Sequence, residues 1–224
     1  MRLLGREVKA VIYDVDGPLV QSFGAIRSAT KAAAQDLGYS VDVIDPYFAK
    51  CGTSGWQPSL ELGVLAMWPN LNEVQVKAFC TLMRNYEKRT RVAATPGAYE
   101  SVMRFRSARI ALGLCTTNDL PALNHRLDCV GLGVNLFNGV CTAESPYMKP
   151  DPMALHYVMD QLYVHPDNTV FIGDWDTDLK AAEGAKVTFL ALTSPEFPRE
   201  KFRELGVPEF FIMDSMTELE GMFE

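Results

Sequence analysis

The stretch IYDVDGPL, residues 12–19, lies at the end of an apolar run. Asp14 and Asp16 stand one residue apart there, and two turn-forming residues, Gly17 and Pro18, follow at once. Two carboxylates this close repel each other, so a purely structural role does not explain them. A site that needs one ionised and one protonated carboxylate does. The pair therefore predicts chemistry at the tip of a buried strand.

Four apolar runs indicate the strands of a parallel sheet. They are short, rich in β-forming residues and apolar at consecutive positions, as strands covered on both faces are: VKAVIYD (8–14), RIALGLCTT (109–117), NTVFIGD (168–174) and VTFLALT (187–193). Helical patterns alternate with them at 96–108, 151–163 and 177–186, and a last strand at 209–215 precedes a short helix. We therefore predict an α/β fold with a doubly wound, Rossmann-like parallel sheet.

Residues 20–92 interrupt this alternation. They contain helical spacing at 22–38, 59–68 and 72–90, and no convincing strand. We therefore predict a helical cap domain over residues 20–92, inserted into a catalytic core of residues 1–19 and 93–224. Its connections to the core are the segments at 18–21 and 91–96, so we expect the insert to move as a lid.

The composition excludes several classes of protein. The chain has 224 residues, 48% of them hydrophobic and 22% charged, which is typical of a globular protein. A net charge of -7 argues against a nucleic-acid partner, which would need clustered Lys and Arg. The five cysteines form no C-x-x-C pair and support neither a disulfide framework nor a zinc site. The sequence has no signal peptide and no membrane span, so we expect a cytoplasmic protein with no membrane partner.

Polar side chains follow the predicted strands at several places. The second strand ends in Thr116 and Thr117, the third runs into GDWDTD (173–178), and Lys149 stands just before a helix in YMKPDP. Open α/β sheets bind ligands in the crevice outside the carboxyl ends of their strands. We therefore expect these groups to converge with the two aspartates of the first strand.

In this order, DVDGPL, LCTT, KPDP and GDWDTD resemble the four motifs of the haloacid dehalogenase superfamily. The branch is the one with a helical cap inserted after the first motif, to which phosphoglycolate phosphatase and β-phosphoglucomutase belong. The resemblance extends over essentially the whole chain. It implies that Asp14 is the nucleophile, Asp16 the general acid and base, Thr116 the hydroxyl that binds phosphate and Lys149 the ammonium that steadies it.

The same resemblance implies a Mg²⁺ site. Asp174 matches a metal ligand beside Asp14 and the backbone carbonyl of Asp16. Asp178 matches the second acid of the last motif, which supports the metal through water or through Lys149. A divalent cation and a fixed ammonium also meet a physical need, because a phosphate monoester is a dianion that repels an approaching carboxylate. Mg²⁺ prefers oxygen ligands such as these.

These residues predict a Mg²⁺-dependent phosphatase that forms an aspartyl-phosphate. We expect a small phosphorylated metabolite as substrate, such as phosphoglycolate or a sugar phosphate, and a monomer or small homo-oligomer. An acid at Asp16 disfavours dehalogenation, because a departing halide needs no proton. Two alternatives stay open. One is a phosphomutase of the β-phosphoglucomutase type, which returns the phosphoryl group to its substrate, and the other is a non-catalytic binding or regulatory module.

Substrate contacts are expected in two regions. Thr117 and Asn118 follow Thr116, and Thr117 takes over as the phosphate ligand if the strand ends one residue later. Within the cap, the loop KCGTSGWQPS (50–59) contains Lys50 and Gln57, and we expect these two side chains to contact the leaving group.

Trp175 follows Asp174 where the superfamily usually has a small residue. Its indole ring either forms a wall of the substrate pocket or packs beneath the loop.

Overall fold

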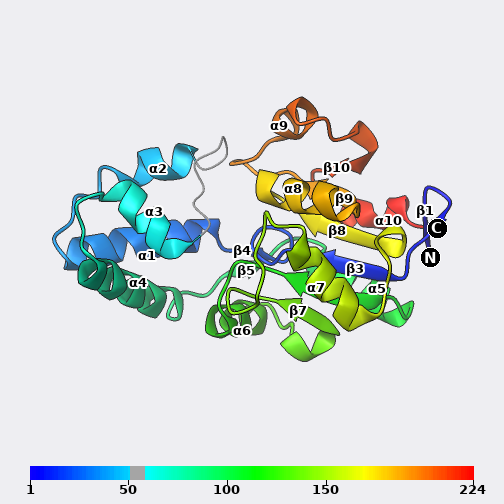
Figure 1. The fold of residues 1–224 in the computed structure, drawn as a ribbon, viewed down its shortest axis with the longest axis horizontal. Coiled ribbons are helices and arrows are strands. Elements are labelled where there is room, and N and C mark those ends of the chain that lie inside the picture. The colour runs from blue at the N-terminus through cyan, green and yellow to red at the C-terminus, as the bar shows by residue number, and fades with distance from the viewer. Residues whose placement is uncertain (51–58) are drawn as a thin grey trace. The chain divides into compact units, whose positions relative to one another are not determined.

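The computed structural model describes residues 1–50 and 59–224. The chain divides into two compact units (Figure 1), one formed by residues 1–21 with 93–224 and the other by residues 22–92. The larger unit contains every strand that the structure describes.

A six-stranded sheet forms the centre of the larger unit. Its strands are all parallel, in the order β10-β9-β8-β3-β6-β7. They are β3 (Ala10–Tyr13), β6 (Ala111–Cys115), β7 (Gly139–Cys141), β8 (Thr169–Gly173), β9 (Thr188–Leu192) and β10 (Ile212–Met213). This confirms the predicted α/β fold. Because β3 lies between β6 and β8, the residues that follow these three strands are neighbours.

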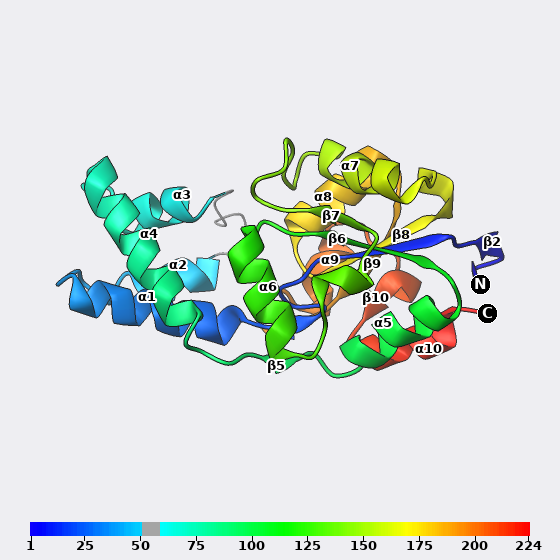
Figure 2. The ribbon, with the colours of Figure 1, turned by 90° about the horizontal axis from the view of Figure 1, so that it is seen from below.

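Helices cover both faces of this sheet. Figure 2 shows α7 and α8 on one face and α5 and α10 on the other. Alternate residues of β3 face the two layers: Ile12 belongs to the core formed with α7 and α8, whereas the Tyr13 hydroxyl is 2.7 Å from Ser101 of α5. The helices of this unit are α5 (Ala98–Ser107), α6 (Leu120–Cys129), α7 (Met153–Leu162), α8 (Asp176–Ala185), α9 (Arg199–Glu204) and α10 (Leu219–Met222).

Shorter elements complete the larger unit. The strands β1 (Arg2–Leu3) and β2 (Arg6–Glu7) pair antiparallel, as do β4 (Val20–Gln21) and β5 (Ala93–Ala94). Four 3₁₀ helices connect the larger elements: η2 (Val134–Leu136), η3 (Pro166–Asn168), η4 (Glu209–Phe211) and η5 (Met216–Glu218).

The predicted strand at 209–215 was right only for Ile212 and Met213, and it was wrong for the three residues before them and the two after them. Pro208, with its fixed φ, starts a turn whose backbone bond runs from Phe211 N–H to the Pro208 carbonyl, so η4 forms before β10 begins.

Residues 22–92 form a helical unit with its own core. The described parts of this unit, residues 22–50 and 59–92, contain α1 (Phe23–Asp36), α2 (Ile44–Lys50), α3 (Leu60–Met67) and α4 (Glu73–Glu87). Ser59 caps the start of α3, and Asn72 and Gln75 form a capping box at the start of α4. Apolar side chains from all four helices, including Phe48 and Phe79, meet in one cluster. The helix α2 was not predicted.

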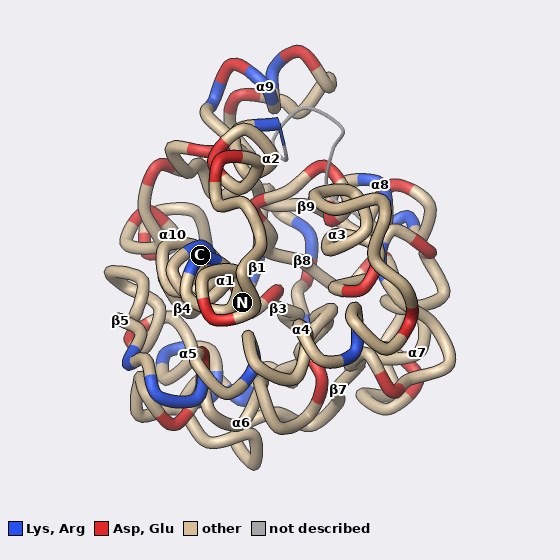
Figure 3. The backbone as a smooth tube through the Cα atoms, turned by 90° about the vertical axis from the view of Figure 1, so that its left-hand side faces the viewer, with Lys and Arg blue, Asp and Glu red and all other residues tan. Residues whose placement is uncertain are grey.

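The two ends of the chain lie together, since Arg2 N–H donates to the Glu224 carbonyl at 2.8 Å. Lys and Arg are interspersed with Asp and Glu along the backbone (Figure 3). Across residues 1–50 and 59–224, no helix has the length and apolar character needed to cross a membrane.

Candidate active site

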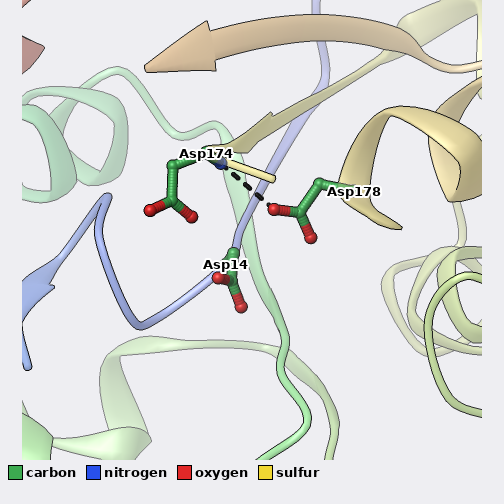
Figure 4. A group of neighbouring side chains, drawn as sticks. All are labelled: Asp14, Asp174 and Asp178. Carbon is green, nitrogen blue, oxygen red and sulfur yellow. Dashed lines mark hydrogen bonds between the residues drawn. The ribbon is translucent and has the colours of Figure 1, made fainter. Parts of the chain in front are cut away.

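Three carboxylates converge at the carboxyl ends of the central strands (Figure 4). Asp14 follows β3 directly, Asp174 follows β8, and Asp178 belongs to the first turn of α8. One oxygen from each lies within 4.8 Å of the others, and all three side chains are buried. The neighbouring positions of β3 and β8 in the sheet bring Asp14 and Asp174 together.

Lys149 connects two of these carboxylates. Its Nζ is 2.7 Å from Oδ1 of Asp14 and 2.6 Å from Oδ1 of Asp178, and the lysine side chain is buried. Burial lowers the pKa of Lys149, but the charges of Asp14 and Asp178 outweigh it and raise this pKa above its ordinary value. The ammonium is therefore a fixed positive charge beside Asp14.

Asp178 also fixes the loop that carries Asp174. Its Oδ2 accepts hydrogen bonds from the backbone N–H groups of Asp174, at 3.1 Å, and of Trp175, at 3.0 Å. The neighbouring Gly173 permits this approach, because a Cβ at that position would lie 2.6 Å from the Asp178 carboxylate. Asp178 therefore connects Lys149 to the loop after β8, because it contacts both.

The donor set fits a divalent cation. Oδ1 of Asp174 is buried and has no hydrogen-bond partner within the described part of the chain. Burial raises the pKa of Asp174, and the charges of Asp14 and Asp178 raise it further. Burial likewise raises the pKa of Asp14 to about 7, where the charges of Asp178 and Asp16 add to the rise and Lys149 opposes it. Crowded, buried carboxylate oxygens of this kind are ligands for a hard cation.

Gly17 leaves the space that the Asp174 carboxylate occupies. Its φ is +99°, and a Cβ there would lie 2.8 Å from Oδ1 of Asp174 and closer still to its Oδ2 and Cγ. The hydroxyl of Thr95, a buried residue just after β5, donates a hydrogen bond to the Gly17 carbonyl. Sequence reasoning missed Thr95, because only the pairing of β4 with β5 brings it to the turn after Asp16.

Thr116 and Thr117 lie in different environments. Thr116 is buried directly after β6, and its hydroxyl accepts hydrogen bonds from the backbone N–H of Asn118 at 3.2 Å and from its Nδ2 at 2.9 Å. Thr117 is exposed. Thr116 therefore remains the better candidate for the phosphate ligand, and Asn118 orients its hydroxyl.

Asn118 and Arg126, from the region after β6, both contact the carboxylate of Asp16. Asn118 Nδ2 donates to its Oδ2 at 2.6 Å, and Arg126 Nε lies 2.8 Å from its Oδ1. Sequence reasoning missed Arg126, which lies in the last turn of α6. The sequence did contain a signal for Arg126. It lies beside Leu123 and Leu127 on the apolar face of the helix, and a charged side chain that is buried on such a face needs a partner of opposite charge.

Trp175 packs against the core. Its ring centroid is 5.9 Å from that of Phe197, and it contacts the apolar cluster of the sheet and α7. This favours the second of the two expected roles, packing beneath the loop.

Of the two predicted leaving-group contacts, Lys50 is an exposed residue at the end of α2, and Gln57 lies outside the described residues. Both contacts stay predictions.

Comparison with known proteins agrees with this geometry. Residues 11–192 match the family model described as haloacid dehalogenase-like hydrolase. The chain belongs to this family. The resemblance inferred from the four motifs is confirmed, and the chain is thereby a hydrolase.

Among curated haloacid dehalogenase-like hydrolases, the chain is similar to phosphoglycolate phosphatases. It is 28% identical over 197 residues to the one from Pseudomonas syringae pv. tomato, which covers 84% of this chain and 71% of the relative. It is 28% identical over 188 residues to the one from Cereibacter sphaeroides, which covers 82% of this chain and 84% of the relative. The expected class, a phosphatase, agrees with these relatives.

The fold is similar to that of solved structures. CbbY from Rhodobacter sphaeroides in complex with phosphate superposes with a TM-score of 0.80 at 18% identity, over 96% of this chain and 99% of CbbY. A mutant of CbbY in complex with xylulose-(1,5)bisphosphate superposes with a TM-score of 0.80 at 17% identity, over 97% of this chain and all of that one.

Proposed function

We propose that this chain is a Mg²⁺-dependent phosphatase of small phosphate monoesters and that Asp14 carries the phosphoryl group as an aspartyl-phosphate. The observation that carries the proposal is the buried contact of Lys149 with Asp14, beside the orphaned oxygen of Asp174. A nucleophilic carboxylate, a fixed ammonium and a cradle for a divalent cation are the groups that attack on a phosphate dianion requires.

In the first half of the reaction, a carboxylate oxygen of Asp14 attacks phosphorus in line with the ester oxygen. The phosphorus–ester bond breaks, and the departing alkoxide takes a proton from Asp16. The hydroxyl of Thr116 and the ammonium of Lys149 hold phosphate oxygens. Lys149 offsets the negative charge that the nucleophile and the phosphate bring together.

In the second half, a water molecule attacks the phosphorus of the aspartyl-phosphate. Asp16, now ionised, takes a proton from this water as the bond to Asp14 breaks, so inorganic phosphate leaves and both aspartates return to their first state. The carboxyl group of Asp16 thus acts first as a general acid and then as a general base.

The metal would be held by the carboxylates of Asp14 and Asp174 and by the backbone carbonyl of Asp16, with Asp178 in support. When bound, it supplies positive charge to the phosphate oxygens. The carboxylates of Asp14, Asp174 and Asp178 crowd around one ammonium, that of Lys149, in the described part of this site. A divalent cation would offset the repulsion among these carboxylates and favour their ionised form.

The substrate class rests on the relatives. The curated relatives are named phosphoglycolate phosphatases, and a CbbY variant binds a sugar bisphosphate. We therefore propose a small phosphorylated acid or sugar as substrate, with Lys50 and Gln57 as predicted contacts to the leaving group.

A screen of small phosphate esters, each with Mg²⁺ and with EDTA, tests the proposal. We expect release of inorganic phosphate that needs the metal and that Asp14→Asn abolishes, since an amide does not attack phosphorus. A sugar bisphosphate as product, without inorganic phosphate, would instead indicate the phosphomutase. Metal-independent turnover, or turnover by Asp14→Asn near that of the wild type, would contradict the mechanism.

A further inference from the structure

Asp16, Asn118 and Arg126 form a closed ring of polar contacts. Arg126 Nε lies 2.8 Å from Oδ1 of Asp16, and Asn118 Nδ2 donates to Oδ2 of the same carboxylate at 2.6 Å. The ring closes because Nη1 of Arg126 donates to the side-chain carbonyl of Asn118. Each member therefore contacts the other two, and both carboxylate oxygens of Asp16 have a donor.

The ring determines how each group is oriented. The guanidinium of Arg126 donates to the side-chain carbonyl of Asn118. The NH₂ group of Asn118 must therefore face Asp16. The same NH₂ group is 2.9 Å from the Thr116 hydroxyl. Rotation of the Asp16 carboxylate is thus tied to the group expected to bind phosphate.

Arg126 is a buried charge, and burying it costs the hydration of its guanidinium group. Only 7% of its side chain is exposed, against 25% for Asp16, and its neighbours on the helix stripe, Leu123 and Leu127, are core residues. An apolar side chain would fill this place without the loss of hydration that a buried charge suffers. A planar guanidinium offers instead two directed donors, which fit a carboxylate and an amide at once.

We propose that Arg126 is a positioning residue, which through Asn118 and by direct contact holds the Asp16 carboxylate where it exchanges protons with the leaving group and with water. The inference rests on the proposed function, in which Asp16 is the general acid and base. Arg126 acts through its contacts with the carboxylate of Asp16 and the side-chain carbonyl of Asn118.

The proposal predicts an effect that depends on the leaving group. An alkoxide is a strong base and needs the proton of Asp16, whereas p-nitrophenolate leaves without it. We expect Arg126→Met to lower kcat about 10- to 100-fold for the best alkyl phosphate of the ester screen and less than about threefold for p-nitrophenyl phosphate, with KM nearly unchanged. Arg126→Lys keeps the positive charge but not the planar guanidinium with its two directed donors, so it should lower kcat on the alkyl phosphate less than Arg126→Met does.

A double-mutant cycle separates positioning from other roles. If Arg126 acts through Asp16, adding Arg126→Met to Asp16→Asn should cost no further activity on p-nitrophenyl phosphate or on the alkyl ester. Arg104→Met is the matched control, because Arg104 lies on α5 and donates to the carbonyls of Leu219 and Phe223 instead. It should leave the ratio of the two substrates as in the wild type.

The outcomes are distinct. Equal losses on both substrates, additive losses in the cycle, or a change confined to KM would overturn this inference and leave the phosphatase proposal standing. A wild type that hydrolyses no ester would overturn both. If Arg126→Met does not fold, Arg126→Lys decides, because it weakens the ring and should show the same dependence on the leaving group.

Discussion

The turn after Asp16 gives the sharpest prediction, the substitution Gly17→Ala. The added methyl group would lie 2.8 Å from Oδ1 of Asp174 and closer still to Oδ2, whereas ordinary contacts of a Cβ begin at 3.4 Å. The added atom is attached to backbone that Thr95 anchors. The Asp174 carboxylate must therefore give way, and it is a proposed ligand of the metal.

Two costs follow, and they differ in kind. A residue with a Cβ is strained at a φ of +99°, and this strain should lower the free energy of unfolding by roughly 1–2 kcal/mol. A displacement of about 1 Å in a group that takes part in catalysis costs on the order of 10²-fold in rate. We therefore expect Gly17→Ala to lower kcat/KM by about 10²-fold or more with Mg²⁺, and to weaken metal binding.

Gly206→Ala is the matched control. Gly206 also has a positive φ, +86°, but a Cβ there would meet nothing within 4 Å. It should show the loss of stability, measured by thermal unfolding, without the loss of kcat/KM on p-nitrophenyl phosphate. If Gly17→Ala keeps more than about a third of wild-type kcat/KM, the close approach of this turn to Asp174 does not serve the metal site, and our reasoning is refuted.

Three further predictions concern the charged groups. Asp16→Asn should lower kcat roughly 10²- to 10⁴-fold on alkyl esters and less on p-nitrophenyl phosphate; an equal loss on both would contradict its role as leaving-group acid. Lys149→Met should lower kcat about 10²- to 10³-fold and lower the melting temperature, because two buried carboxylates lose their cation; near-normal turnover would remove Lys149 from the mechanism. Burial raises the pKa of Asp14 from 3.8 to about 7, so between about pH 4 and 7 this carboxyl group binds more protons in the folded protein than in the unfolded chain. In EDTA, the contribution of Asp14 to the stability should therefore fall as pH rises through this range. Lys149, whose pKa is also raised, stays charged in both states there. Thermal unfolding of the wild type and of Asp14→Asn checks this, since the wild type alone should show this part of the decline, and Mg²⁺ should stabilise the wild type more at pH 8 than at pH 5.

The parts of the fold that the sequence predicted are those whose signal is local. β3, β6, β8 and β9 are buried on both faces and therefore appear as continuous apolar runs. β7 has three residues and each strand of the β4–β5 pair has two, which is too short for any pattern. These strands form because of the partner beside them.

The same distinction applies to the site. Asp14, Asp174 and Lys149 could be brought together by argument, because the ends of parallel strands meet at one edge of the sheet. Arg126 could not be assigned to Asp16, because the contact joins residues 110 positions apart and depends on how α6 packs. The roles of all these residues stay predictions until activity is measured.

The pairing of β4 with β5 has a consequence for how the chain folds and diverges. Gln21 lies opposite Ala93, so the roughly 70 residues between them form an insertion between two paired strands. Closing a disordered loop of that length costs about 4 kcal/mol of chain entropy, but most of this cost falls away if the four helices fold first and bring their own ends together. Doubling the length of such a loop costs only about 0.6 kcal/mol more. Insertions and deletions can therefore accumulate in residues 22–92 over evolutionary time while β3 and its neighbours in the sheet keep their register.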